Sequence, residues 1–150
     1  MITRIPEFRI ALFGFLTAFI WEIWQMPFYD RSELTFNTMV QGCSLGSLGD
    51  AGIMVFAYHV AARIGSSPQW LVNPTRRALA IYLSTGLVIT IVIEQLAINL
   101  RFGWRYGDMM PVEPIFGTGL VPIAMWIAVP LATLWMARLP GPIDRSDDHA

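Results

Sequence analysis

The sequence has no lysine, a single cysteine and few charged residues of either sign. All ten basic residues are arginines, so no lysine-rich patch is present to recruit nucleic acid, and we expect no nucleic-acid partner. The single cysteine, Cys43, excludes an intrachain disulfide and a CxxC redox pair, and we interpret it as a packing residue. Charged residues make up 14% of the chain and hydrophobic residues 55%, which is too apolar for an ordinary soluble domain. The composition therefore indicates a membrane protein whose main partner is the lipid bilayer.

Four apolar segments are each long enough to cross a membrane. A helix that rises about 1.5 Å per residue needs roughly 17 to 20 residues to cross about 30 Å of hydrocarbon, and lipid accepts only helices for such segments. We therefore predict an all-α, polytopic integral membrane protein, with a bundle of four transmembrane helices in one domain, residues 1–138. The predicted helices, followed by a polar disordered tail, are about 10–26, 38–64, 78–100 and 115–137, and then 139–150.

The arginines are divided unequally between the two sides of this predicted bundle. Four spans place both termini on one side, together with the connection between the second and third helices. Seven of the ten arginines fall on that side, and only Arg31, Arg101 and Arg105 fall on the other. Because positive residues accumulate in cytoplasmic segments, we predict cytoplasmic N- and C-termini in a multi-pass protein of a prokaryotic inner or plasma membrane.

Three acidic residues lie within the apolar segments. Glu22 is 12 residues beyond Ile10 and Glu94 is 16 residues beyond Ala78, which places them about 18 Å and about 24 Å from the inner boundary. Asp50 falls near the midplane on the second predicted helix. An ionised side chain at the centre of a membrane helix costs about 2.5 to 3.5 kcal/mol on insertion scales, and such groups usually face the bundle interior and pair. These depths place the acids in the middle and outer half of the bundle.

The placement of these acids favours a ligand site. We expect Arg101 and Arg105, at the outer rim, to offset part of the negative charge. Since the acids outnumber these arginines, at least one carboxylate is left for a proton, water or a ligand. The competing interpretation is a set of interhelical hydrogen bonds and ion pairs that only specifies packing. The candidate ligand-binding residues are Glu22, Asp50, Glu94, Asn99, Arg101, Arg105 and Glu113.

The second predicted helix carries a row of glycines. Gly42, Gly46 and Gly49 recur at i, i+4 and i+7, a spacing that predicts one face where another helix can approach closely. We interpret the row as a helix-packing surface, either inside the bundle or toward a second copy or a larger membrane complex. Asp50 follows Gly49 directly and lies beside this surface.

Histidine gives no support for a metal or haem site. His59 is nine residues from Asp50, nearly half a turn away around the helix, and neither an HxxxH nor an HxxE pair accompanies it. We therefore predict no metal site and interpret His59 as a residue of the inner boundary, near Arg63.

Tryptophan and tyrosine cluster near the ends of the predicted helices. Such residues usually form belts at the two membrane–water interfaces, and we interpret them in this way. The expected belt residues are Trp21, Trp24, Tyr29, Trp104 and Tyr106 on the outer side and Trp70 and Trp135 on the inner side.

One segment is similar to a known family. The sequence EQLAINLRFGWRYGDMMPVE, residues 94–113, has an acid in a helix, then G-W-x-Y, then a proline two residues before a glutamate. This pattern resembles part of the small membrane lycopene cyclase domain of carotenoid biosynthesis. The resemblance implies an isoprenoid cyclase in which Glu94 and Glu113 carry the proton chemistry. The family's Pro-x-Glu-Glu/Asp motif is incomplete, because the chain reads PVEP at residues 111–114.

Several functions stay open at this point. The first, which we prefer, is a pocket in the outer half that binds a small or lipophilic ligand, with or without turnover. The others are a proton- or cation-linked transport element, an accessory or assembly subunit with a structural polar cluster, and a cyclase-like enzyme. A catalytic pocket predicts a closed apolar cavity beside the acids, and transport predicts polar access from both faces. A subunit predicts that the glycine surface faces outward and is empty.

Overall fold

The described part of the chain is built from four long helices. The computed structural model describes residues 5–32, 34–65, 70–100 and 103–139. The helices are α1 (Pro6–Gln25), α2 (Phe36–Ile64), α3 (Arg76–Asn99) and α4 (Leu120–Arg138), and a short 3-10 turn (Met26–Phe28) follows α1. All four are long and apolar enough to span a membrane. The predicted all-helical architecture with four candidate spans is therefore confirmed. Residues 140–150 of the predicted tail lie outside the described residues.

Local sequence signals set the starts of the first three helices. Pro6 occupies the first turn of α1, where its fixed φ suits the helix and its missing N–H has no partner to lose. Thr35 caps α2 through a reciprocal pair of hydrogen bonds with Thr38. Thr75 caps α3 by accepting a 3.1 Å hydrogen bond from the Ala78 amide.

The fourth helix begins at Leu120 rather than at about residue 115 as predicted. The carboxylate of Glu113 accepts hydrogen bonds from the amides of Ile115 and Phe116, and these bonds close a turn that competes with the helix. Gly117 then adopts a φ of 70°, a left-handed conformation that favours glycine. The segment 115–119 is therefore part of a loop.

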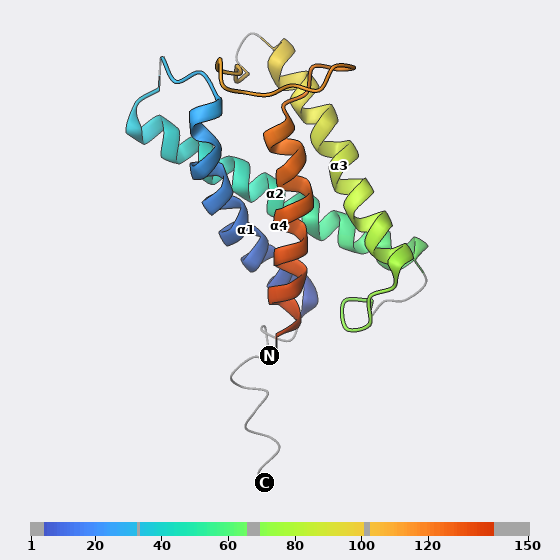
Figure 1. Ribbon diagram of the computed structural model, residues 1–150. Coiled ribbons are helices and arrows are strands. Elements are labelled where there is room, and N and C mark those ends of the chain that lie inside the picture. Colours follow the sequence, from blue (N-terminus) through green and yellow to red (C-terminus); the bar gives the residue numbers. More distant parts are fainter. Residues whose placement is uncertain (1–4, 33, 66–69, 101–102, 140–150) are drawn as a thin grey trace.

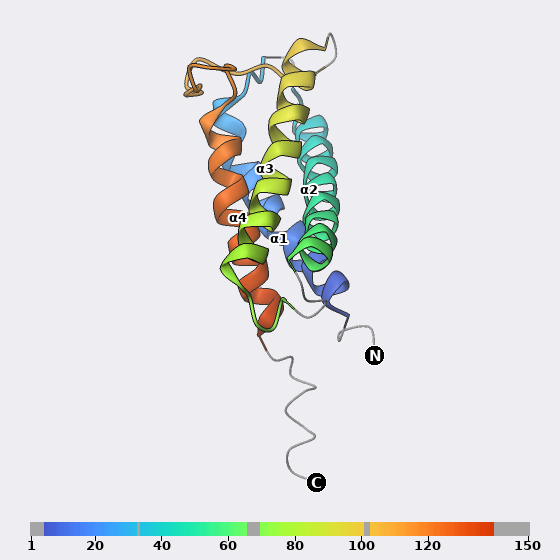
Figure 2. The ribbon, with the colours of Figure 1, turned by 90° about the vertical axis from the view of Figure 1, so that its right-hand side faces the viewer.

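The four helices form a closed ring. Each helix packs against its neighbours in sequence, and α4 returns to pack against α1. Figure 1 shows α2 crossing obliquely behind α1 and α4, and Figure 2 shows α3 between α2 and α4. The Arg9 guanidinium donates to the Leu139 carbonyl, so the start of α1 meets the end of α4. We call this the terminal end of the bundle, and the opposite end, where the α1–α2 and α3–α4 connections lie, the loop end.

Close approach between helices depends on two glycines. A Cβ atom added at Gly86 of α3 would overlap the indole ring of Trp126 on α4, which is only 1% exposed. A Cβ added at Gly14 of α1 would stand 3.0 Å from Met54 Sδ and 3.6 Å from Ala51 Cα on α2. The tight contacts of the bundle are therefore α3–α4 at Gly86 and α1–α2 at Gly14.

Gly42 and Gly49 do not form a packing surface inside the bundle, which was one of the two predicted roles of the glycine row. No atom lies within 4 Å of a Cβ built at either residue, so both face open space, and only Gly46 contacts another helix. The buried face of α2 is instead formed by Cys43, Ser47, Ala51, Met54, Ala57, Tyr58 and Ala61. The helix is rotated so that this small-residue face, offset by one position from the glycines, meets the bundle. Cys43 is buried in it, as expected of a packing residue.

Candidate functional site

The structure brings together the three acids identified from the sequence. Glu22 lies on α1, Asp50 on α2 and Glu94 on α3, and each is close enough to the other two for their charges to interact. The carboxyl carbon of Glu22 is 3.4 Å from the position of a Cβ at Gly46, one turn before Asp50. The missing side chain of Gly46 thus lets the Glu22 carboxylate approach α2. We call Glu22, Asp50 and Glu94 the acid cluster.

Buried polar side chains on α1 hold one edge of the cluster. Gln25 is 3% exposed, and it hydrogen-bonds the Glu22 carboxylate. The indole N–H of Trp21 donates to Gln25 Oε1 at 3.0 Å. Because residues four apart share one face of a helix, Trp21 and Gln25 orient Glu22 from its own helix.

Glu94 accepts two hydrogen bonds from the α3–α4 connection. The Tyr106 hydroxyl donates to Glu94 Oε2 at 2.6 Å, and the indole N–H of Trp104 donates to the same oxygen at 3.2 Å. The Gly119 amide donates in turn to the Tyr106 hydroxyl at 3.0 Å. Tyr106 therefore joins the buried carboxylate, 5% exposed, to the backbone just before α4.

The two connections at the loop end are joined by their backbones. Tyr29 and Tyr106 form an antiparallel bridge, and the Asp30 amide donates to the Arg105 carbonyl at 3.0 Å. The rings of Tyr29 and Tyr106 are 5.8 Å apart. Figure 1 shows the loop of residues 103–119 lying across the top of the bundle. We call Tyr29, Trp104 and Tyr106 the aromatic lid.

The lid tyrosines sit in a strongly negative environment. Burial raises the pKa of Tyr29 well above its usual range, and the charges of Glu94, Glu22 and Asp50 raise it further. Burial and the hydrogen bond to Glu94 likewise raise the pKa of Tyr106. Both phenols are therefore neutral over the physiological pH range, and the charges of all three acids act on Tyr29.

A hollow of about 480 Å³ lies on the other side of the lid. Tyr29 and Tyr106 line the hollow and also interact with the acids, so the same two residues border both the hollow and the acid cluster. The residues lining the hollow are Pro27, Tyr29, Asp30, Arg31, Tyr106, Gly107, Asp108 and Met109.

Of the other predicted ligand-binding residues, the described ones have different partners from the acid cluster. Asn99 is exposed and donates to the Gln95 carbonyl on its own helix. Arg105 is exposed on the loop, and its charge acts on Asp30; Arg101 lies outside the described residues. Among the residues described, no basic side chain forms an ion pair with the acid cluster. The charge of Arg105 acts on Asp30 in the loop, and an offset of the acid cluster by Arg101 and Arg105 stays a prediction.

Glu113 closes a turn of the loop. Its carboxylate accepts hydrogen bonds from the amides of Ile115 at 2.7 Å, Phe116 at 2.6 Å and Thr118 at 3.2 Å. Desolvation raises the pKa of the Glu113 carboxyl, but the backbone N–H bonds together outweigh it and lower the pKa below its usual range. The residue thus uses its oxygens to shape the segment before α4.

This hydrogen bonding predicts that the turn is sensitive to acid. A carboxyl whose pKa is lowered by folding stabilises the folded form above its unfolded pKa, about 4.3, and loses that contribution as the pH falls through the folded value. We expect the Ile115 and Phe116 amides to keep their protection factors from pH 7 to about pH 4 and to lose them below. In Glu113→Gln, protection should be lower throughout and independent of pH, because the amide offers only one acceptor.

Hydrogen exchange in detergent micelles measures these protection factors directly. Asp108→Asn, which removes an exposed carboxyl from the same loop, is the control and should behave as the wild type. Equal protection in the wild type and Glu113→Gln at pH 7 would contradict this role.

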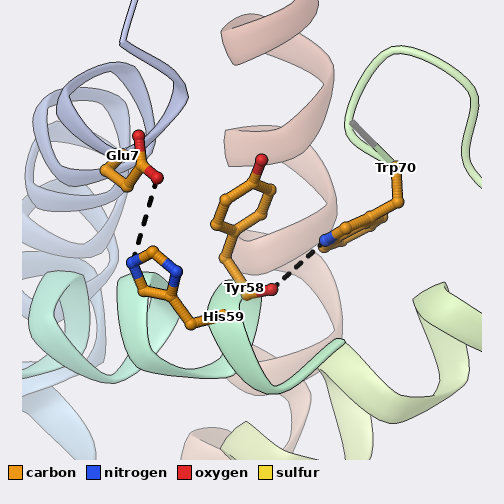
Figure 3. A network of polar contacts seen from close by, with 4 residues as sticks. All are labelled: Glu7, Tyr58, His59 and Trp70. Atoms are coloured by element: carbon orange, nitrogen blue, oxygen red, sulfur yellow. Dashed lines mark hydrogen bonds and ion pairs between the residues drawn. The ribbon is translucent and has the colours of Figure 1, made fainter. Parts of the chain in front are cut away.

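His59 belongs to the terminal end of the bundle, far along α2 from the acid cluster. Figure 3 shows it facing Glu7 of α1, with 3.9 Å between His59 Nε2 and Glu7 Oε1, while the Tyr58 carbonyl accepts a 3.2 Å hydrogen bond from Trp70. Within the described ranges, no group of three histidine, cysteine, aspartate or glutamate residues could hold a metal ion.

Comparison of the chain with protein-family models, with curated proteins and with solved structures found no match. The resemblance to lycopene cyclases stays a prediction. Under it, Glu94 is the acid beneath the aromatic lid, and Glu113 is the carboxylate already bonded to three backbone amides.

The sequence interpretation missed the second half of the site. The sequence pattern predicts an interfacial belt for Tyr29, Trp104 and Tyr106 and gives no role to Gln25. One signal was present: Trp104 and Tyr106 are two residues apart, and in an extended segment such residues share one face. The contact between Tyr29 and Tyr106, by contrast, joins connections that are far apart in the chain.

Proposed function

We propose that this chain is a multi-pass membrane protein that binds a lipophilic organic cation in the acid cluster, beneath the aromatic lid. The observation that carries the proposal is the approach of three carboxylates from three helices, with no basic partner in the described part of the chain. Burial of an unpaired ion costs several kcal/mol. Such a cluster is therefore completed either by protons or by a bound cation.

The aromatic residues around the acids favour an organic cation. Aromatic faces attract cations by about 0.5 to 2 kcal/mol, more when water is excluded. Trp104 and Tyr106 donate hydrogen bonds to Glu94, and the Tyr29 ring lies 5.8 Å from that of Tyr106. Trp21 donates to Gln25, the hydrogen-bond partner of Glu22 on α1. A ligand with a delocalised positive charge and an apolar surface matches both features.

The distribution of arginines supports an orientation for this binding. With the terminal end cytoplasmic, the hollow at the loop end opens to the outer side, and a cation arrives there first. Two acids, Asp30 and Asp108, and one arginine, Arg31, line the hollow, so acids outnumber basic residues there. Hydrogen bonds from Ser32 lower the pKa of the Asp30 carboxyl, so it stays ionised and attracts the cation. Passage then requires the two lid tyrosines to move, which breaks the Tyr106–Glu94 hydrogen bond.

The test uses two ions of equal size and opposite charge, tetraphenylphosphonium and tetraphenylborate. Equilibrium binding is measured on the purified protein in phosphatidylcholine nanodiscs, with empty nanodiscs as the background. We expect the wild type to bind the phosphonium above background and the borate not at all. Asp50→Asn and Glu22→Gln should each weaken phosphonium binding about tenfold or more, since a tenfold change corresponds to about 1.4 kcal/mol.

The matched control is Glu7→Gln, which removes a carboxylate from the opposite end of α1. Its affinity for the phosphonium should equal that of the wild type. The proposal fails if both ions bind alike, if neither binds, or if Glu7→Gln weakens binding as much as Asp50→Asn does.

One observation favours a second candidate function, an assembly subunit of a membrane complex. Gly42, Gly49 and Gly52 on α2 have no atom within 4 Å of a built Cβ, as the subunit hypothesis expects of an outward surface. A second helix could approach closely there. This function needs no ligand at the acid cluster, so it predicts no specific phosphonium binding.

A further inference from the structure

A second hollow lies at the terminal end, on the side of the bundle formed by α3 and α4. Its volume is about 280 Å³, and it is lined by the first residues of α3 and the last two turns of α4. Arg76 and Arg138, which begin and end these two helices, stand at its rim. The hollow is therefore separated from the acid cluster by most of the length of the bundle.

The two arginines bring unpaired positive charge to one place. Arg76 and Arg138 are both exposed, and no carboxylate within the described ranges forms an ion pair with either. They come from helices that are distant in sequence, so the fold itself creates the pair. Guanidinium groups bind phosphate oxygens in bidentate geometry, so the rim suits a phosphate group.

The wall of the hollow is apolar and belongs to two helices that are long and apolar enough to span a membrane. Leu79 is three residues into α3 from Arg76, and Leu131 is seven residues before Arg138. At about 1.5 Å per residue these leucines lie about 5 Å and about 10 Å along the helices from the arginines. Trp135 lies between Leu131 and Arg138 on α4 and is 64% exposed. Tryptophan commonly marks the level of the lipid headgroups in membrane proteins.

We propose that this hollow binds an anionic phospholipid, with the headgroup phosphate on Arg76 and Arg138 and the first acyl carbons against Leu79 and Leu131. Charge complementarity selects the anionic headgroup, and basic pockets between membrane helices are a recurrent form of lipid recognition. A free phosphate would use the arginines and leave the leucine wall uncovered. The occupant is therefore a lipid and not a soluble anion.

The test compares two pairs of charge-neutralising substitutions that change the net charge equally. Arg76→Gln/Arg138→Gln removes the rim, and Arg63→Gln/Arg77→Gln removes two exposed arginines that are outside the hollow at the same end. Native mass spectrometry counts the lipids retained by each protein from micelles containing equal amounts of phosphatidylglycerol and phosphatidylcholine. We expect the wild type and the Arg63/Arg77 variant to retain phosphatidylglycerol about tenfold over phosphatidylcholine, and the Arg76/Arg138 variant to show no preference.

Further measurements distinguish loss of the lipid site from general charge attraction, from binding of a soluble anion and from misfolding. Leu131→Gln should lower phosphatidylglycerol retention while leaving the rim charge intact. Inorganic phosphate at millimolar concentration should not displace the lipid from the wild type. Equal loss in the two double variants would overturn the proposal in favour of general charge attraction, and displacement by phosphate would overturn it in favour of a soluble anion. Because tetraphenylphosphonium is proposed to bind at the opposite end, its binding should be unchanged in the Arg76/Arg138 variant, and this binding also confirms folding.

Discussion

Replacement of Gly86 by alanine is expected to destabilise the bundle strongly. The added Cβ would overlap Cζ3 and Cε3 of Trp126 and stand 3.0 Å from its Cη2. The indole is 1% exposed and lies between helices, so it has no free space into which it can turn. Overpacking of a core typically costs about 1 to 3 kcal/mol, occasionally more. We expect the upper part of this range, because a rigid ring and a helix backbone must separate.

Thermal unfolding in one detergent measures the effect, and Gly49→Ala is the matched control. It makes the same change in a membrane-length helix at a site with no atom within 4 Å. Since alanine favours a helix over glycine by about 0.5 to 1 kcal/mol, the control should melt at the wild-type temperature or above. Adding Trp126→Leu to Gly86→Ala should restore part of the loss. Similar melting of Gly86→Ala and Gly49→Ala would show that α3 and α4 do not meet as described.

The number of helices and the grouping of the acids follow from simple properties of the sequence. Length and apolarity are sufficient to find four candidate spans, because the bilayer imposes one length and one kind of secondary structure. Counting residues from the start of each span placed Glu22 and Glu94 at similar depths in two helices that run in the same direction. Depth therefore predicts that both lie in the outer half of the bundle, and in the structure the charges of the two interact.

The rotation of a helix about its axis is harder to predict. The glycines and the buried small residues of α2 are offset by one position, and both patterns have helical periodicity. Gly42 and Cys43 illustrate the difference, since the first faces open space and the second is buried. Which face is buried depends on the partner helix, here through the contact of Gly14 with Met54. A single helix does not contain that information.

The aromatic lid and the start of α4 depend on loop structure. Tyr29 meets Tyr106 through backbone pairing between two separate connections, which no local pattern encodes. At residues 113–119 an apolar run typical of a helix is overridden by hydrogen bonds to one carboxylate, that of Glu113. The same pairing brings Arg105 close to Asp30, whose pKa its charge lowers.

A second large effect is expected on the stability of the protein when the acid cluster is neutralised. Glu22→Gln combined with Asp50→Asn replaces two carboxylates by amides of nearly the same shape. If the cluster is kept for a ligand, the ligand-free variant should be as stable as the wild type or more stable. The upper bound of the gain is set by the insertion cost of a charged residue, about 2.5 to 3.5 kcal/mol for each acid.

A polar pair that only holds the bundle together should behave differently. Thr17→Val removes the 2.9 Å hydrogen bond to buried Thr133, and this variant should be less stable than the wild type.

The most direct measurement is the melting temperature of the wild type and of Glu22→Gln/Asp50→Asn, each with and without tetraphenylphosphonium. A ligand that binds only the folded protein raises the melting temperature. We expect the cation to stabilise the wild type alone, while the ligand-free double variant melts at the wild-type temperature or higher. A double variant that melts well below the wild type, with no effect of the cation on either protein, would show that the acids hold the bundle together and would contradict a ligand site.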